Sequence, residues 1–122
     1  MITNEEIATV KVVAYRKAPG LHPELAVSPR ILDLNSFPKG KVKVKWVLLT
    51  KGYSFPQKGA IVFTSPGAER NFGGAEIDCD GKVAVATAAN EDGVAYAYSV
   101  TVVDESTGLV SVLDPIVQNN SQ

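Results

Sequence analysis

The chain has 122 residues, of which 45% are hydrophobic and 20% are charged, a composition typical of one folded domain rather than of a disordered segment. Its formal net charge is −1, so no overall positive field favours nucleic acid or an anionic membrane. With Cys79 as its one cysteine, the chain forms no internal disulfide, as is usual in a reducing compartment. It shows neither a secretory signal nor an apolar run of the roughly 18 residues that span a bilayer. We therefore predict a single cytoplasmic domain over residues 1–122.

Apolar and polar residues alternate along most of the chain, which predicts β-strands rather than helices. In the first expected strand, Ile7–Arg16, the side chains of Val10, Val12 and Ala14 share one face. The second, Leu25–Leu34, contains Pro29, which cannot donate a ladder hydrogen bond and is expected at a sheet edge or a bulge.

The clearest alternation follows a turn at Ser36–Gly40 and occupies Lys41–Leu48. Four apolar residues there are expected to face the core, namely Val42, Val44, Trp46 and Leu48. Three lysines are expected to face water, namely Lys41, Lys43 and Lys45. This is the pattern of a half-buried strand.

The remaining expected strands are Gly59–Ser65, Ala75–Asp78, Lys82–Ala88, Val94–Val103 and Leu109–Gln118. Asp80-Gly81, a dipeptide favoured in tight hairpins, connects the expected strands Ala75–Asp78 and Lys82–Ala88. Seven to eight short strands with turn residues between them predict an antiparallel β-sandwich.

The sequence lacks the ligand sets of the common metal sites. A blue-copper site uses two histidines, a cysteine and usually a methionine, and this chain offers only His22, Cys79 and Met1. A structural zinc site is excluded too, because it needs four cysteine or histidine ligands. Asp78-Cys79-Asp80-Gly81 resembles the start of a calcium loop but lacks its glutamate at the twelfth position. We predict no metal and no cofactor, with His22 exposed in a loop and Cys79 in the core or a strand.

Half of the basic residues lie within twenty positions, at Lys39, Lys41, Lys43, Lys45, Lys51 and Lys58. Lysines on one strand face suit contact with phosphates or another acidic partner. The favoured alternative is a solvated outer face that protects an edge strand from pairing with other chains. No glycine pattern for phosphate binding is present, so we predict neither a nucleic-acid partner nor a small-molecule ligand.

The last expected strand contains the bond Asp114-Pro115. An aspartate carboxyl lies close enough to attack its own backbone carbonyl, with the rate advantage of an intramolecular reaction. The proline nitrogen, once protonated, leaves more readily than an ordinary amide nitrogen. A fold accelerates this reaction by burying the carboxyl so that it keeps its proton, or by supplying a second carboxylate to activate a water. The alternative is that Pro115 protects a terminal edge strand.

From about residue 40 onward, the chain resembles the DP-EP family of small bacterial β-sandwich proteins. The segments that carry this resemblance are Val44–Leu48, Gly52–Phe55, Gly59–Ile61, Tyr96–Val102 and Leu113–Asn119. The resemblance implies an immunoglobulin-like sandwich and, in part of the family, self-cleavage at an Asp-Pro bond by aspartic-peptidase chemistry with a single catalytic aspartate. Asp114 and Pro115 match the scissile pair.

The chain departs from this pattern near the expected site. Ala97 stands where the resemblance leads us to expect a lysine, which argues against a lysine cross-link, and Tyr98–Val103 contains no aspartate. Asp104 is the nearest acid and the candidate for activating water. Two hypotheses follow. The chain is either a self-cleaving protein acting in cis at Asp114-Pro115, or a non-catalytic binding or homo-oligomeric assembly module that uses strand edges or the lysine face at Lys41–Lys45.

Overall fold

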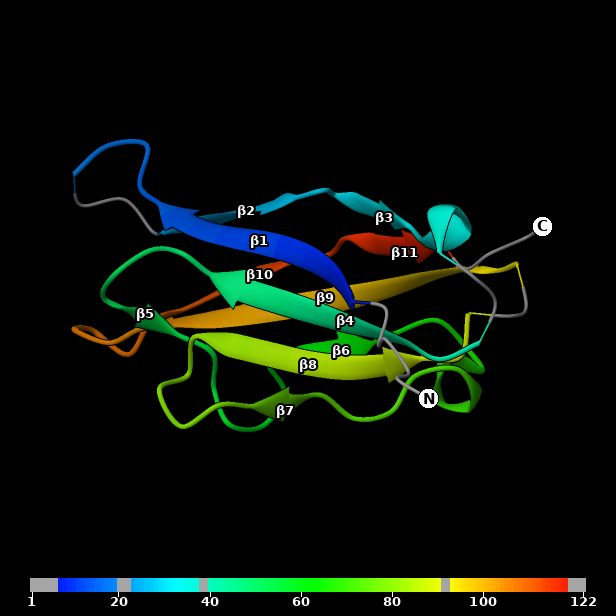
Figure 1. Ribbon diagram of the computed structural model, residues 1–122. Helices are drawn as coiled ribbons and strands as arrows, with labels where there is room; N and C mark the ends of the chain where they lie inside the picture. The colour runs from blue at the N-terminus through cyan, green and yellow to red at the C-terminus, as the bar shows by residue number, and fades with distance from the viewer. Residues whose placement is uncertain (1–6, 20–22, 38–39, 91–92, 119–122) are drawn as a thin grey trace.

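The computed structural model describes residues 7–19, 23–37, 40–90 and 93–118, and His22 and Met1 lie outside the described residues. Two β-sheets pack face to face with the core between them (Figure 1). This confirms the predicted β-sandwich. The described strands are β1 (Ile7–Tyr15), β2 (Glu24–Ser28), β3 (Ile31–Asp33), β4 (Val42–Leu48), β5 (Tyr53–Ser54), β6 (Ile61–Phe63), β7 (Glu76–Ile77), β8 (Val83–Ala88), β9 (Ala95–Asp104), β10 (Val110–Leu113) and β11 (Ile116–Gln118).

The first sheet has the strand order β2-β1-β4-β8-β7. The second sheet is built around β9, which pairs with β10 and β11 along one edge and with β5 and β6 along the other, while β3 pairs with β11. Two short 3-10 helices, Leu34–Ser36 and Ala68–Arg70, lie in the connections. None of the helices in the described ranges has the length and apolar character needed to cross a membrane.

Both sheets are mixed, because two of the nine strand pairs in the described ranges are parallel and the others are antiparallel. β1 runs parallel to β4, and β3 runs parallel to β11. After β2 the chain crosses to the second sheet as β3 and returns to the first sheet as β4 (Figure 1). A crossover of this length lets two strands of one sheet run in the same direction, which a two-residue hairpin does not allow.

Proline accounts for most of the difference between the eight expected strands and those observed. The expected strand Leu25–Leu34 divides into β2 and β3 around Pro29, and Leu109–Gln118 divides into β10 and β11 around Pro115. β2 and β3 are edge strands of different sheets, as expected for a segment whose proline lacks an N–H. The short strand β5 was not expected.

The alternating patterns lie on the predicted faces. Residues of β1 alternate between exposed and buried along the whole strand, and in β4 every second residue from Val42 to Leu48 is buried. The Trp46 indole N–H donates a 3.1 Å hydrogen bond to the Tyr98 hydroxyl across the core. Burial raises the pKa of Tyr98 to about 12, so the phenol stays protonated at neutral pH.

The β7–β8 connection is the turn predicted at Asp80-Gly81. The Asp78 carboxylate accepts hydrogen bonds from the backbone N–H groups of Lys82 and Val83, at 2.8 and 3.2 Å. Gly81 has a φ of +70°, and a Cβ there would lie 3.0 Å from the Cβ of Ser54, so this position requires glycine. Cys79 lies exposed in this turn, and its expected place in the core or a strand was therefore wrong.

Candidate functional site

The bond between Asp114 and Pro115 lies inside a single interrupted strand. β10 pairs Leu113 with Val100, and β11 pairs Ile116 with Ala97. Two residues lie between Leu113 and Ile116, and two lie between Ala97 and Val100 on β9. Asp114 and Pro115 therefore continue the same register along β9. The Tyr98 N–H donates a 3.1 Å hydrogen bond to the Pro115 carbonyl. The chain is thus held against β9 on both sides of the bond.

The two residues face opposite sides of the sheet, as alternation along a strand requires. Pro115 is buried toward the core, and the Asp114 side chain is exposed. Within the described part of the chain, the Asp114 carboxylate has no hydrogen-bond or ion-pair partner. Pro115 has no N–H to donate to the Tyr98 carbonyl, so the two residues exchange one ladder hydrogen bond instead of two.

The structure does not bring Asp104 to this bond. The register places Asp114 opposite Ser99, and Asp104 lies five residues further along β9, at the far end of the strand, where it pairs with Tyr53. At the usual strand rise five residues span about 17 Å. The expected pairing of Asp104 with Asp114 therefore has no geometric support, because the hairpin from β9 to β10 folds back and carries Asp114 away from Asp104.

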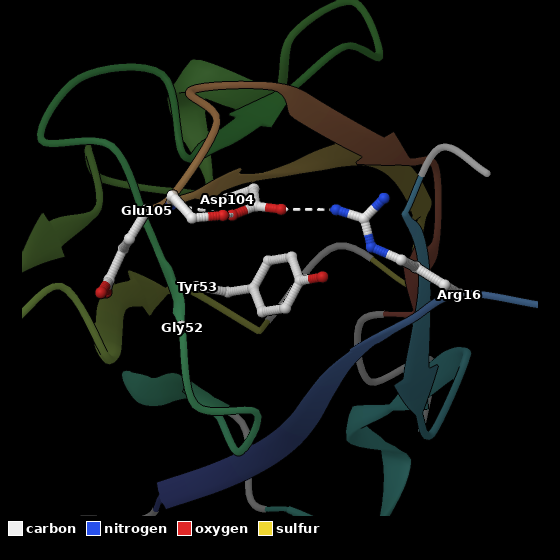
Figure 2. A pocket seen from close by; sticks show the side chains of 6 residues that line it. Arg16, Gly52, Tyr53, Asp104 and Glu105 are labelled. Atoms are coloured by element: carbon white, nitrogen blue, oxygen red, sulfur yellow. Dashed lines mark hydrogen bonds and ion pairs between the residues drawn. The ribbon is translucent and has the colours of Figure 1, made fainter. Parts of the chain in front are cut away.

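Asp104 instead joins the two sheets at one end of the sandwich (Figure 2). One carboxylate oxygen accepts a 2.7 Å hydrogen bond from the Arg16 guanidinium, directly after β1. The other accepts from the Ser106 hydroxyl at 2.7 Å and the Ser106 N–H at 2.9 Å. These bonds to Ser106, and then the charge of Arg16, hold the pKa of Asp104 below its ordinary value despite its burial. A carboxylate with both oxygens engaged is a stabilised anion and a poor general base.

A pocket of about 490 Å³ opens beside this ion pair and is lined by Arg16, Gly52, Tyr53, Asp104, Glu105 and Ser106. Figure 2 shows the Tyr53 ring below the ion pair, with Glu105 pointing away from it. Glu105 accepts a 2.9 Å hydrogen bond from the Lys82 ammonium. The charged groups that line the pocket thus bind one another or a neighbouring lysine, an arrangement that stabilises the end of the sandwich.

We expect the free energy of unfolding to become sensitive to acid through Asp104. Its folded-state pKa is lowered, so its contribution is present above the ordinary value of 3.8 and is lost as pH falls through the lower folded value. Urea titrations from pH 7 into the acid range should show a shallower pH dependence for Asp104→Asn than for the wild type. In Ser106→Ala, an NMR titration of the Asp104 carboxyl should give a pKa closer to 3.8. An unchanged pKa in Ser106→Ala would contradict this account.

Only one of the two contacts of Asp104 could be predicted from the sequence. Aspartate followed two residues later by serine is a common local turn pattern, so the contact between Asp104 and Ser106 was readable. Arg16 lies 88 residues away from Asp104, and no local pattern predicts that contact.

The lysine face lies on the outer side of β4. Lys43 and Lys45 are partly buried there, and Lys41 is exposed just before the strand. β4 pairs with β1 on one side and β8 on the other, so it is not an edge strand. The prediction that these lysines protect an edge strand was therefore wrong. In the described part of the chain, no group of three or more His, Cys, Asp or Glu residues is arranged to hold a metal ion.

The chain matches no protein-family model and no curated protein.

Proposed function

We propose that this protein cleaves its own Asp114–Pro115 bond, with Asp114 as the single catalytic carboxyl of an aspartic-peptidase type reaction in cis. The proposal is supported by a difference between the backbone and the side chain at this bond. The residues on both sides are held in register against β9, while the Asp114 carboxyl stands in water. The carboxyl is therefore free to rotate toward its own carbonyl, and the departing proline stays anchored.

The proposed reaction requires only the chain itself and one water molecule. The protonated Asp114 carboxyl attacks its own backbone carbonyl carbon, its proton passes to the Pro115 nitrogen, and the C–N bond breaks to leave a cyclic anhydride and a free proline amine. One water molecule then opens the anhydride to a C-terminal aspartate. Because the attacking carboxyl must carry its proton, we expect faster cleavage at acidic pH than at neutral pH.

The surroundings predict a slow reaction. The Asp114 carboxyl is exposed rather than buried, and Asp104 is distant and engaged by Arg16 and Ser106. General acid–base assistance contributes on the order of 10²- to 10⁴-fold in enzymes, and the described surroundings offer no such group. Ala97 lies opposite Ile116 and carries no amine, so hydrolysis rather than an isopeptide is the expected outcome.

The intact mass of purified protein tests the proposal. We expect the wild type, held for days at mildly acidic pH, to lose Pro115–Gln122, and Asp114→Asn to keep its full mass. Asp104→Asn is the matched control and should cleave at the wild-type rate. The mass must be measured under denaturing conditions, because β11 pairs with both β9 and β3 and would stay bound after cleavage. A single full-length mass at every pH would contradict the proposal.

We also propose the immunoglobulin-like variety of sandwich for this fold. Its support is the passage of the chain from β2, at an edge of the first sheet, to β3, which runs parallel to β11 in the second. Such an edge segment shared between two sheets is compatible with Greek-key sandwiches.

A further inference from the structure

The edge strand β6 has backbone groups that the rest of the described chain leaves unpaired. Among the described residues, β6 pairs only with β9. The Thr101 N–H of β9 donates a 2.8 Å hydrogen bond to the Ala60 carbonyl, directly before β6. Hydrogen-bonded and non-bonded pairs alternate along an antiparallel ladder. The N–H and C=O groups of Ile61 and Phe63 therefore point away from β9, and together they form an unpaired edge.

The β6 edge faces open space rather than packed chain. A cavity of about 310 Å³ lies beside it and is lined by the residues of β6 and by residues of the segment 68–74. Ile61 is 8% exposed and Phe63 is partly buried, so their unpaired backbone groups have little contact with water. Backbone groups in such positions are usually paired in folded proteins. A further strand placed beside β6 would pair them.

β6 lacks the features that discourage pairing at the other edge strands, such as charges, proline or a covering contact. The edge strands β2, β3 and β7 each contain an acidic residue. At β5, the Tyr53 carbonyl accepts a hydrogen bond from the Lys82 ammonium. β10 is tied to the chain before β2, because the Ser111 hydroxyl donates a 2.7 Å hydrogen bond to the Pro23 carbonyl. β6 has the sequence Ile61-Val62-Phe63, with no charge and no proline.

We propose that a second copy of this chain pairs along β6, edge to edge and antiparallel, to form a twofold dimer with Val62 on the symmetry axis. In this register Ile61 of each copy lies opposite Phe63 of the other, and the two residues exchange both of their hydrogen bonds. The unpaired groups of one copy are thus satisfied by the same groups of the other. This is the self-complementarity that a twofold interface requires. The side chain of Val62, which is 44% exposed, meets its own copy on the outer face of the joined sheet.

This dimer uses one of the strand edges suggested by the sequence and leaves the lysine face free. It also leaves the Asp114–Pro115 bond uncovered, because β6 lies on one side of β9 and β10 and β11 lie on the other. β6 has only 3 residues, so the interface is smaller than the roughly 1,600 Å² of a standard one. We therefore expect a weak dimer that forms at high concentration.

Sedimentation equilibrium over a range of concentrations tests the proposal. We expect the wild type to shift from monomer to dimer as concentration rises. Val62→Lys and Val62→Glu, each measured alone, should weaken the association at least tenfold, because like charges then meet at the symmetry axis. An equimolar mixture of the two variants should recover the association, since a lysine then faces a glutamate. Trp46 fluorescence checks that each variant is folded.

Val112→Lys is the matched control, because Val112 is an exposed valine of the same sheet, 56% exposed, on the other side of β9. It should dimerise like the wild type. A wild type that stays monomeric at every concentration would overturn the proposal. So would an equal effect of Val112→Lys and Val62→Lys, or a mixture of the two Val62 variants that associates no better than either alone. None of these results depends on whether the Asp114–Pro115 bond is cleaved, because β11 does not contribute to the β6 edge.

Discussion

Replacement of Trp46 by alanine is expected to lower the free energy of unfolding by about 3–5 kcal/mol, the usual cost of truncating a large buried aromatic residue. Trp46 is fully buried at the middle of the core. Its ring packs edge-on against Tyr98 at 5.5 Å and against Phe63 at 6.4 Å. Because Trp46 belongs to the first sheet and both neighbours to the second, the truncation opens a cavity between the sheets. Urea unfolding followed by far-UV circular dichroism measures the loss without depending on the tryptophan signal.

Tyr98→Phe is the companion variant, because it keeps the ring and removes the hydroxyl. The Trp46 N–H then loses its acceptor, and an unsatisfied buried donor costs about 1–3 kcal/mol. The expected order of stability is therefore wild type, then Tyr98→Phe, then Trp46→Ala. A loss below about 1 kcal/mol for Trp46→Ala would be incompatible with a core residue of this size.

Local sequence patterns predicted the strands and their buried faces, because a strand alternates its side chains whatever it pairs with. Val42, Val44, Trp46 and Leu48 are buried as expected. The partner of each strand depends on the path of the whole chain, and for this reason the parallel pairs of β1 with β4 and of β3 with β11 were not foreseen.

The candidate site shows the same division between local and long-range information. Asp114-Pro115 was readable as a chemically labile pair, but the division of the expected strand into β10 and β11 at Pro115 was not predicted. The separation of Asp104 from Asp114 follows from the register of β9 with β10, which residue spacing alone does not set.

A chain that ends at Asp114 is expected to be less stable than the full chain by at least about 3 kcal/mol. It loses Val117, which is fully buried, and burying a valine contributes about 1.5–3 kcal/mol. It also loses the buried Pro115 and the pairing of β11 with both β9 and β3, where each net hydrogen bond adds about 0.5–1.5 kcal/mol. Urea unfolding of the shortened and full chains at one pH measures the difference. A chain that ends at Gln118 keeps β11 and serves as the control for length.

Adding a peptide of residues Pro115–Gln122 to the shortened chain separates loss of the strand from loss of the covalent bond. If β11 is held by its two neighbours and by Val117, the peptide should bind and restore stability in proportion to its concentration, since a ligand that binds only the folded chain stabilises it by mass action. Self-cleavage would then leave a folded, nicked sandwich whose stability has become dependent on concentration. Equal stability of the shortened and full chains, with no effect of the peptide, would contradict the pairing of β11 with β9 and β3 and the burial of Val117.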